Sequence, residues 1–420
     1  MSGGSVLDAP IDERDLPPSA HDSSLVWVRR NLFSSAFNSV LTVVMGAVVV
    51  WATYRLVVFV FVTAEWEIVQ RNLTLFMVGR FPRDELWRMW VSIGILAVTI
   101  GAVGGMVATT EREVAQQTGR VLPKGSALAM ARRFWPGLLL VAVLLGFTRT
   151  LTPALMTLVV AALGTVAYRF GRVAPGGVRR RWWLLFSAGF VGSIVVLTAA
   201  GGVGWNNWTG LHLNLFVAFA GIVLAFPFGL LLALGRRSSL PAVRAVSVGF
   251  IELFRGVPLI TLLLMAQLAL GFLLPSYVDP PGLVIRALIV IVFFEAAYIA
   301  EIVRGGLQSL PRGQVEAAQA LGLSPLTIMR TITLPQALRA VIPAMVGQFI
   351  SLFQDTSLLS AITLLEVLSV SQLVTNQEAF VGQGLQSVTL PFVAFIFWAV
   401  SYSMSRESRR LETRLGIGVR

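Results

Sequence analysis

The sequence predicts an all-α polytopic membrane protein with about ten transmembrane helices. Of its 420 residues, 56% are hydrophobic and 13% are charged, and the mean hydropathy is +0.78, values far from those of a soluble globular domain. The hydrophobic residues form runs long enough to cross a hydrocarbon layer about 30 Å thick. The net charge of +12 comes mainly from arginines that cluster between these runs. This distribution is typical of the positive-inside rule and disfavours a nucleic-acid-binding surface.

Residue types that are rare or missing exclude several kinds of chemistry. Cysteine is absent, so disulfides, thiolate catalysis and cysteine metal sites are excluded. Histidine occurs only at His21 and His212, too few for a histidine metal site or a catalytic triad. The single lysine, Lys124, does not follow a phosphate-binding glycine loop. We therefore expect no metal, no bound cofactor and no nucleotide hydrolysis on this chain, which would not itself be an enzyme.

The first half of the chain is expected to hold a tail and an N-terminal extension. Residues 1–24 are polar, contain Pro10, Pro17 and Pro18 and lack an apolar period, which predicts a disordered cytoplasmic tail. Residues 25–205 are expected to form about five transmembrane helices. The charge-balanced, tryptophan-flanked segment 63–88 predicts an outer loop. The expected spans are 37–62, 89–109, 136–147, 153–168 and 182–203.

The second half, residues 206–420, is expected to be a core of about five further transmembrane helices. Arginines that follow alternate spans indicate the cytoplasmic side. They place both termini and the segment 311–335 in the cytoplasm. The expected spans are 213–234, 257–274, 283–303, 340–359 and 388–405.

Residues 311–335 form a polar, small-residue segment between two apolar runs, and two short helices are predicted within it. Pro311 suits a first helical turn, and Gly322 is a natural stop. Ser324 then predicts the N-cap of a second helix, which Leu334 and Pro335 are expected to end. Alanines on the first helix would let another protein approach its backbone closely. The alternative is an ordinary loop between membrane helices.

Polar side chains in or beside the apolar runs of the second half suggest a polar translocation path, because such groups are costly inside a bilayer. Glu295, Tyr298 and Glu301 recur at three-residue spacing, which places them roughly on one helical face. Structural hydrogen bonding between helices is the alternative for each residue. The candidates are Glu252, Arg255, Gln267, Glu295, Tyr298, Glu301, Gln348, Gln354, Asp355, Thr356 and Ser357.

The spacing of the segment 311–335 resembles the signature loop of the permease subunits of ABC-type importers. The pattern E-A-A-x3-G-x9-I-x-L-P is matched at Glu316, Ala317, Ala318, Gly322, Ile332, Leu334 and Pro335. Flanking segments, among them FRGVPLI and QDTSLLSAI, resemble the polar amino acid permeases of the histidine and glutamine type. The segment VGRFPRDELWR, residues 78–88, resembles the larger permease subunit of general L-amino-acid or glutamate/glutamine/aspartate/asparagine importers. Gln354 departs from this pattern, because family members commonly carry lysine there.

The resemblance implies that the segment 311–335 forms coupling helices that dock on a separate ATPase. Gly313 and Gln314 would join the matched positions in that contact. The resemblance also implies several partners. These are two ATP-binding subunits that hold ATP and magnesium, a second permease chain that is identical or paralogous, and an extracytoplasmic solute-binding protein. The chain would then be a multi-pass protein of the bacterial inner membrane.

The functional hypothesis is a permease subunit of an ATP-driven importer of L-amino acids, polar or acidic ones. Arg255 and the run Gln354–Ser357 are expected near the substrate, because a zwitterion needs partners for a carboxylate and an ammonium group. The alternative is a secondary transporter driven by an ion gradient, which also uses broken helices and polar residues at mid-membrane depth. It predicts uptake without ATP and gives no reason for the matched spacing.

Overall fold

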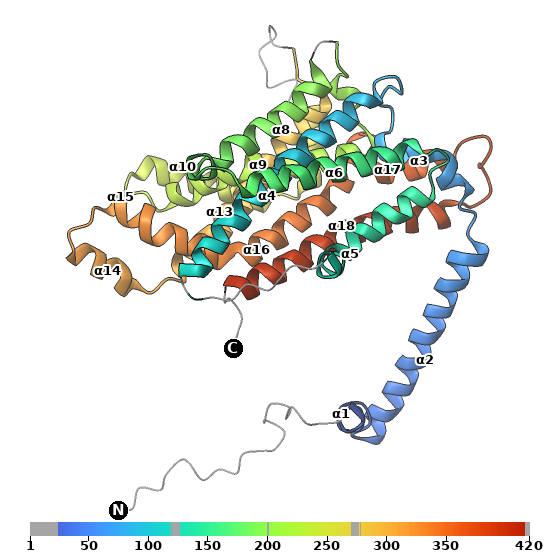
Figure 1. Cartoon of the computed structure of the whole chain (residues 1–420), viewed down its shortest axis with the longest axis horizontal. Helices are drawn as coiled ribbons and strands as arrows, with labels where there is room; N and C mark the ends of the chain where they lie inside the picture. The colour runs from blue at the N-terminus through green and yellow to red at the C-terminus, as the bar shows by residue number, and fades with distance from the viewer. Residues whose placement is uncertain are drawn as a thin grey trace, which may run out of the picture. The chain divides into compact units, whose positions relative to one another are not determined.

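The computed structural model describes residues 24–117, 119, 127–199, 201–269, 277 and 279–415 (Figure 1). The secondary structure of these residues is helical, apart from one bridge that pairs Gly210 with Glu366. The chain divides into two compact units, Met1–Glu65 and Trp66–Arg420. The tail expected at 1–24 lies outside the described residues except for its last residue.

The first unit consists of two consecutive helices. The short helix α1 spans Ser24–Leu32, and α2 spans Ala36–Val58 and ends in a π-helical turn, Phe59–Thr63. Ser35 caps α2, since its hydroxyl accepts a hydrogen bond from the backbone N–H of Asn38 at 3.1 Å. No residue of α2 is buried, although the helix is apolar. Such a helix suits a lipid environment.

The second unit is a bundle of long helices that run roughly alongside one another (Figure 1). Short 3-10 segments at Trp205–Asn207 and Thr356–Ile362 and a π-helical turn at Met329–Thr333 interrupt or join them. The helices are α3 Glu67–Val78, α4 Leu86–Gln117, α5 Ala127–Gly146, α6 Thr152–Arg172, α7 Gly176–Arg180, α8 Trp182–Thr198, α9 Gly210–Arg236, α10 Pro241–Gly256, α11 Leu259–Leu268, α13 Leu283–Gln308, α14 Arg312–Ala320, α15 Pro325–Ile328, α16 Leu334–Asp355, α17 Val367–Thr375 and α18 Gln386–Leu415.

Glycines set the packing of α4 against α6. A Cβ on Gly105 would lie 2.2 Å from the carbonyl oxygen of Tyr168, and one on Gly171 would lie 2.0 Å from that of Ala102. The two backbones are therefore in direct contact, which only glycine allows, as in other closely packed membrane helices. The helix α8 also packs on α4, where a Cβ on Gly189 would lie 2.0 Å from the hydroxyl of Thr99.

The remaining contacts join the extension to the core. Phe186 and Phe190 of α8 pack on Phe219 of α9. On α5, Trp135 lies 5.8 Å from Tyr402 of α18, measured between ring centroids. Within the core, α13 packs on α9, α10, α11 and α16. The extension thus contacts the core through α8 and α5, and also through α3, which packs on α9 and α17.

The direction of the helices follows from contacts at their ends. Arg88, at the start of α4, donates to the carbonyl of Val196 at the end of α8, at 2.9 Å. Trp208, just before α9, donates to the carbonyl of Val203 at 3.1 Å. The far end of α9 meets α13 where Arg236 pairs with Glu301. Because α13 leads directly to α14, the ends of α4 and α9 lie on the same side of the bundle as α14.

The count of about ten membrane spans stays a prediction. Seven helices are long and apolar enough to cross a membrane, counting only the described residues, or eight if the bent pair α10 and α11 forms one span. These two helices meet at 100°. Within the expected span 257–274, α11 covers Leu259–Leu268, and residues 270–274 lie outside the described part. The helix α8, with 17 residues, is an additional shorter apolar helix.

The expected outer loop 63–88 contains the helix α3, which the sequence analysis missed. Ile68, Val69 and Phe76 of this helix are fully buried, and α3 packs on α9 and α17. Its apolar face repeats at helical spacing, but the charged residues on the opposite face gave the segment the composition of a loop.

Candidate functional site

The helix α14 has well-defined ends. Pro311 is its N-cap, one residue earlier than the first-turn position expected from the sequence. At the other end Gly322 adopts a φ of 75°, in the left-handed region that favours glycine. The backbone N–H of Leu323 then donates to the carbonyl of Ala318 at 3.2 Å, which closes the helix with a Schellman motif. The prediction that Gly322 stops the helix is confirmed.

The second helix begins as predicted but does not end where predicted. The hydroxyl of Ser324 accepts a hydrogen bond from the N–H of Thr327 at 3.3 Å, which confirms the N-cap. After α15 the chain passes through the π-helical turn Met329–Thr333 directly into α16. Pro335 lies in the first turn of α16, and just before it the N–H of Leu334 donates to the carbonyl of Met329, which closes the π-turn. Residues 325–362 therefore form one continuous helical stretch.

Most of α14 and α15 is exposed at the end of the bundle. Of the residues expected in the coupling contact, Gly313, Gln314, Glu316 and Ala317 are exposed. Ala318 is buried, and so is Ile328 on α15. The helix therefore turns one side toward its neighbour and presents Glu316 and Ala317 outward.

Two exposed leucines beside the turn were missed by the sequence analysis. Leu321 is 81% exposed and Leu326 is 77% exposed. Leu321 precedes Gly322 directly and Leu326 follows four residues later, both within the polar segment 311–335, and that context is the signal that could have identified them. Large apolar side chains projecting into water at a helical turn suit contact with another protein.

The last matched positions lie elsewhere in the structure. Ile332, Leu334 and Pro335 are half-buried in the π-turn and the first turn of α16. They connect the exposed α14–α15 surface to the membrane helix. Their position suits transmission of a movement and does not suit direct contact with a docked partner.

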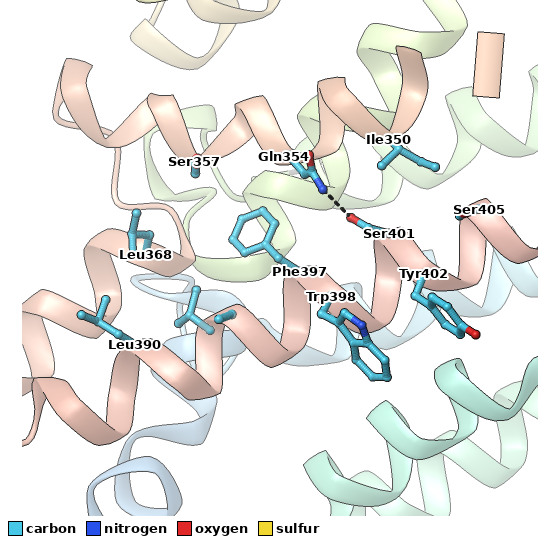
Figure 2. Close-up of a pocket in the computed structure, with 12 residues that line it drawn as sticks. Ile350, Gln354, Ser357, Leu368, Leu390, Phe397, Trp398, Ser401, Tyr402 and Ser405 are labelled. Carbon is cyan, nitrogen blue, oxygen red and sulfur yellow. Dashed lines mark hydrogen bonds between the residues drawn. The ribbon is translucent and has the colours of Figure 1, made fainter. Parts of the chain in front are cut away.

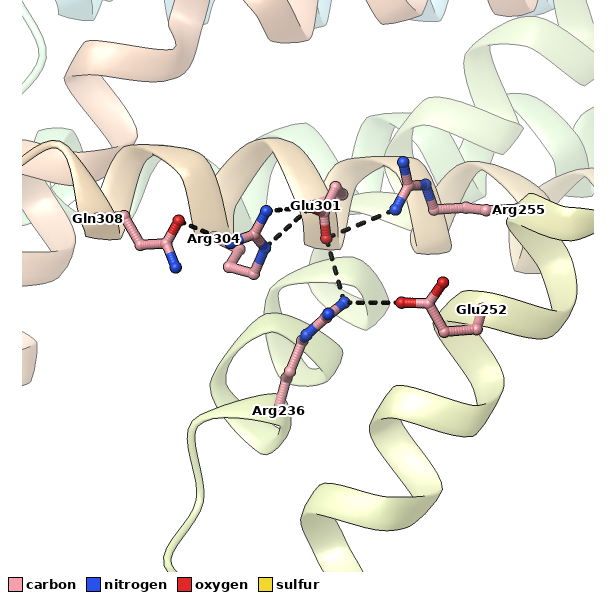
Figure 3. Close-up of polar contacts among 6 residues, drawn as sticks. All are labelled: Arg236, Glu252, Arg255, Glu301, Arg304 and Gln308. Atoms are coloured by element: carbon pink, nitrogen blue, oxygen red, sulfur yellow. Dashed lines mark hydrogen bonds and ion pairs between the residues drawn. The ribbon is translucent and has the colours of Figure 1, made fainter.

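An ion-pair cluster joins α9, α10 and α13 on the side of the bundle that leads to α14 (Figure 3). Glu301 of α13 pairs with Arg236 of α9 at 3.2 Å, with Arg255 of α10 at 3.6 Å and with Arg304 one turn along its own helix. Glu252 adds a contact with Arg236 at 3.3 Å. Three arginines thus share one carboxylate as their main partner.

Glu295, Tyr298 and Glu301 have different neighbours. Glu295 is fully buried and accepts from the side-chain amide of Gln348 on α16, at 3.1 Å. Tyr298 lies under the guanidinium of Arg255, 5.6 Å from its ring centroid. Since an α-helix turns about 100° per residue, positions six apart are rotated by about 120°. The spacing therefore spreads the two carboxylates over two faces of α13.

A groove of about 810 Å³ runs between α16 and α18 (Figure 2). Gln354 and Ser357 line it together with Ser401, whose hydroxyl lies 3.4 Å from the amide nitrogen of Gln354. Aromatic side chains of Phe397, Trp398 and Tyr402 form its other wall. This groove combines apolar walls with a few hydrogen-bonding groups, as sites for small ligands do.

Of the remaining candidates, Thr356 and Gln267 have structural partners. The hydroxyl of Thr356 is buried and accepts from Asn214 at 3.0 Å. Gln267 receives a hydrogen bond from Arg286 at its backbone carbonyl, at 3.0 Å. Asp355 is half-buried at the end of α16. The predicted path residues thus separate into the ion-pair cluster, the Glu295–Gln348 pair and the groove, with Thr356 and Gln267 outside them.

Asn214 also contacts a residue that the sequence analysis did not single out. It donates to Glu366, which caps α17 by accepting from the N–H of Ser369 at 2.6 Å. Burial raises the pKa of Glu366, opposed by these hydrogen bonds. Its contacts define a helix cap and an interhelical link.

No metal site is found among the described residues, in which no three histidine or carboxylate side chains gather. The apolar helices of the bundle define a membrane protein, and the exposed helical turn α14–α15 lies at one end of it, with a continuous helix behind.

Comparison with known proteins agrees with this class. Residues 225–416 match the family described as binding-protein-dependent transport system inner membrane component. The chain is 35% identical to the inner membrane amino-acid ABC transporter permease protein YhdY of Escherichia coli (strain K12), over 96% of each chain. It is 33% identical to the glutamate/glutamine/aspartate/asparagine transport system permease protein BztC of Rhodobacter capsulatus, over 95% of each.

A shorter relative matches only part of the chain. The glutamate/aspartate import permease protein GltK of Escherichia coli O6:H1 is 35% identical over 200 residues, which are 47% of this chain and 87% of that one. The chain belongs to the family of ABC transporter permeases, multi-pass components of the bacterial inner membrane. Within it, the chain is similar over nearly its whole length to long members such as YhdY and BztC.

Proposed function

We propose that this chain is a transmembrane permease subunit of an ATP-driven importer that carries L-amino acids, polar or acidic ones, into the cell. The names of its relatives support the substrate class, because YhdY and BztC are described as amino-acid and glutamate/glutamine/aspartate/asparagine permeases. The family assignment favours this function over a secondary transporter driven by an ion gradient.

The observation that carries the proposal is the exposed α14–α15 surface joined without a break to α16. Leu321 and Leu326 project from it, and burying one leucine contributes about 1.5–3 kcal/mol. A docked ATPase would cover both leucines together with Glu316 and Ala317. Movement of that partner would then reach the membrane through the π-turn and α16.

The proposal includes the partners that such a subunit needs. Two ATP-binding subunits would hold ATP and magnesium, and this chain would bind neither. A second permease chain, a copy or a paralogue, and an extracytoplasmic solute-binding protein would complete the importer. The arginine clusters support an orientation with α14 and both termini in the cytoplasm.

For the substrate, the groove between α16 and α18 and the separate Glu295–Gln348 pair are the parts of the predicted path that we favour. Gln354, Ser357 and Gln348 offer hydrogen bonds within or beside an apolar helix, where polar groups are costly. Arg255 already pairs with Glu301 and stacks on Tyr298. A substrate carboxylate would have to compete with Glu301 for it.

The docking surface is tested with the double variant Leu321→Ser/Leu326→Ser in the complex assembled with its ATPase. We expect at least a tenfold loss of ATPase co-purification and of substrate-stimulated ATP hydrolysis, because both leucines lose their burial. Leu240→Ser is the matched control, since Leu240 is 61% exposed but lies outside α14–α15. Unchanged ATPase association in the double variant would rule out this surface.

A further inference from the structure

The connection between α6 and α8 carries the densest basic cluster in the described chain. Five arginines lie between positions 169 and 181, and no acidic residue interrupts them. Arg179 pairs with Glu113 of α4 at 2.7 Å. The side chains of the others are exposed, namely Arg169, Arg172, Arg180 and Arg181.

Apolar side chains are exposed among these arginines. Phe170 is 70% exposed and Val173 is 79% exposed. Trp182 and Trp183 follow at the start of α8, also exposed, and the exposed Leu184 continues the apolar surface along the helix. We refer to residues 169–183 as the arginine hairpin. Arginine beside tryptophan at a helix end is typical of the level where lipid headgroups meet hydrocarbon.

The arginine hairpin is held firmly at one end of the bundle. The hydroxyl of Thr109 on α4 donates to the carbonyl of Arg172 at 3.0 Å, and the Glu113–Arg179 pair lies one turn beyond. The direct backbone contact between α4 and α6 at Gly105 and Gly171 fixes the same region. Since α4 ends on the side of α14, the hairpin faces the same side of the membrane as the coupling helices.

We propose that the arginine hairpin binds the phosphate headgroups of anionic phospholipids. Guanidinium groups form strong paired hydrogen bonds with phosphate oxygens, and four exposed arginines with no acidic residue between them in the sequence attract a negative surface. The exposed indoles and leucines would lie among the first acyl carbons below. A soluble protein docked here would instead have to cover the apolar surface that continues into the span of α8. The proposed orientation assigns this site to the cytoplasmic leaflet, whereas the binding itself is independent of orientation.

Tryptophan quenching in nanodiscs tests this site with the full chain. Two kinds of disc are compared, both made mainly of phosphatidylcholine. One contains a minor fraction of brominated phosphatidylglycerol, and the other contains the same fraction of brominated phosphatidylcholine. In both lipids the bromine is on the acyl chains near the headgroup. The chain has 11 tryptophans, so the signal from the hairpin is the difference between the native chain and Trp182→Phe/Trp183→Phe. We expect brominated phosphatidylglycerol to quench this signal more strongly than brominated phosphatidylcholine at equal content, with less preference at high salt.

Arginine variants show whether the cluster causes the preference. Removing two arginines in Arg180→Gln/Arg181→Gln should weaken the phosphatidylglycerol preference on the order of tenfold. The control Arg237→Gln/Arg409→Gln removes the same charge from exposed positions outside the hairpin. It should leave the phosphatidylglycerol preference unchanged.

Equal quenching by the two lipids in the native chain would overturn the proposal without any variant. A preference that survives Arg180→Gln/Arg181→Gln would overturn it as well. Loss of a co-purifying ATPase in that variant, without a lipid preference in the native chain, would assign the arginines to protein docking instead.

Discussion

At the scale of single residues, Glu301 is the carboxylate on which the ion-pair cluster of the core depends. Its carboxylate meets the guanidinium groups of Arg236, Arg255 and Arg304, which come from three different helices. Without it, these positive charges would face one another near the end of the bundle. Glu301 therefore fixes α9 and α10 against α13 just before the chain enters α14.

Replacing Glu301 by glutamine should destabilise the core by about 2 kcal/mol, because charge-assisted hydrogen bonds are lost and three arginines repel one another. Thermal unfolding of the purified chain measures this change as a lower midpoint. Glu252→Gln is the matched control, since Glu252 contacts only Arg236 at 3.3 Å and its side chain is 58% exposed. Equal midpoints for the two variants would contradict the central role of Glu301.

Single residues also show what could be read from the sequence in the candidate site. Gly322 and Ser324 were predictable, because their roles depend on local backbone chemistry. The partners of Glu295 and Glu301 were not, since they come from α9, α10 and α16, far away in sequence. Leu321 and Leu326 were missed because leucine is common throughout a membrane protein, and only the structure shows that these two side chains are exposed.

At the scale of helices, the N-terminal extension depends on glycine contacts between α4 and α6. Hydropathy predicted most of these helices as spans, but it carries no information on which of them touch. The same limit explains the missed helix α3 and the continuous stretch 325–362, in which a π-turn, and not a helix end, precedes Pro335. Local signals define where helices can start, whereas tertiary packing decides where they continue.

Gly105→Ala should destabilise the extension by about 1–3 kcal/mol, because its Cβ would lie 2.2 Å from the carbonyl oxygen of Tyr168 and the helices must separate. Gly94→Ala on the same helix is the control, since nothing lies within 4 Å of its Cβ. That change should be neutral or slightly stabilising, as alanine favours helix more than glycine does. Thermal unfolding of both variants in one detergent compares them, and an equal effect would show that the close contact is unimportant.

At the scale of the whole molecule, the extension contacts the core through α3, α5 and α8. The match to GltK covers 47% of this chain but 87% of that permease, so most of a shorter relative corresponds to about half of this chain. The extra helices add the basic surface of the arginine hairpin and leave the α14–α15 surface exposed. Both surfaces lie on the same side of the bundle.

The sequence predicted the class of protein better than it predicted the packing of the helices. Composition, arginine clusters and the spacing from Glu316 to Pro335 predicted a membrane subunit with a docking surface. The separation of the polar residues into the ion-pair cluster, the Glu295–Gln348 pair and the groove depends on how helices rotate against one another, which a single sequence does not specify.

Uptake by proteoliposomes tests the central claim most directly. The chain is reconstituted with the partners proposed for it, an ATPase, a second permease chain and a solute-binding protein. The accumulation of labelled L-glutamate and L-glutamine is measured with and without ATP on the ATPase side. We predict uptake that requires ATP, that an ion gradient does not replace and that Glu316→Lys abolishes. Uptake driven by an ion gradient without ATP, or full ATP-dependent uptake by Glu316→Lys, would contradict the account.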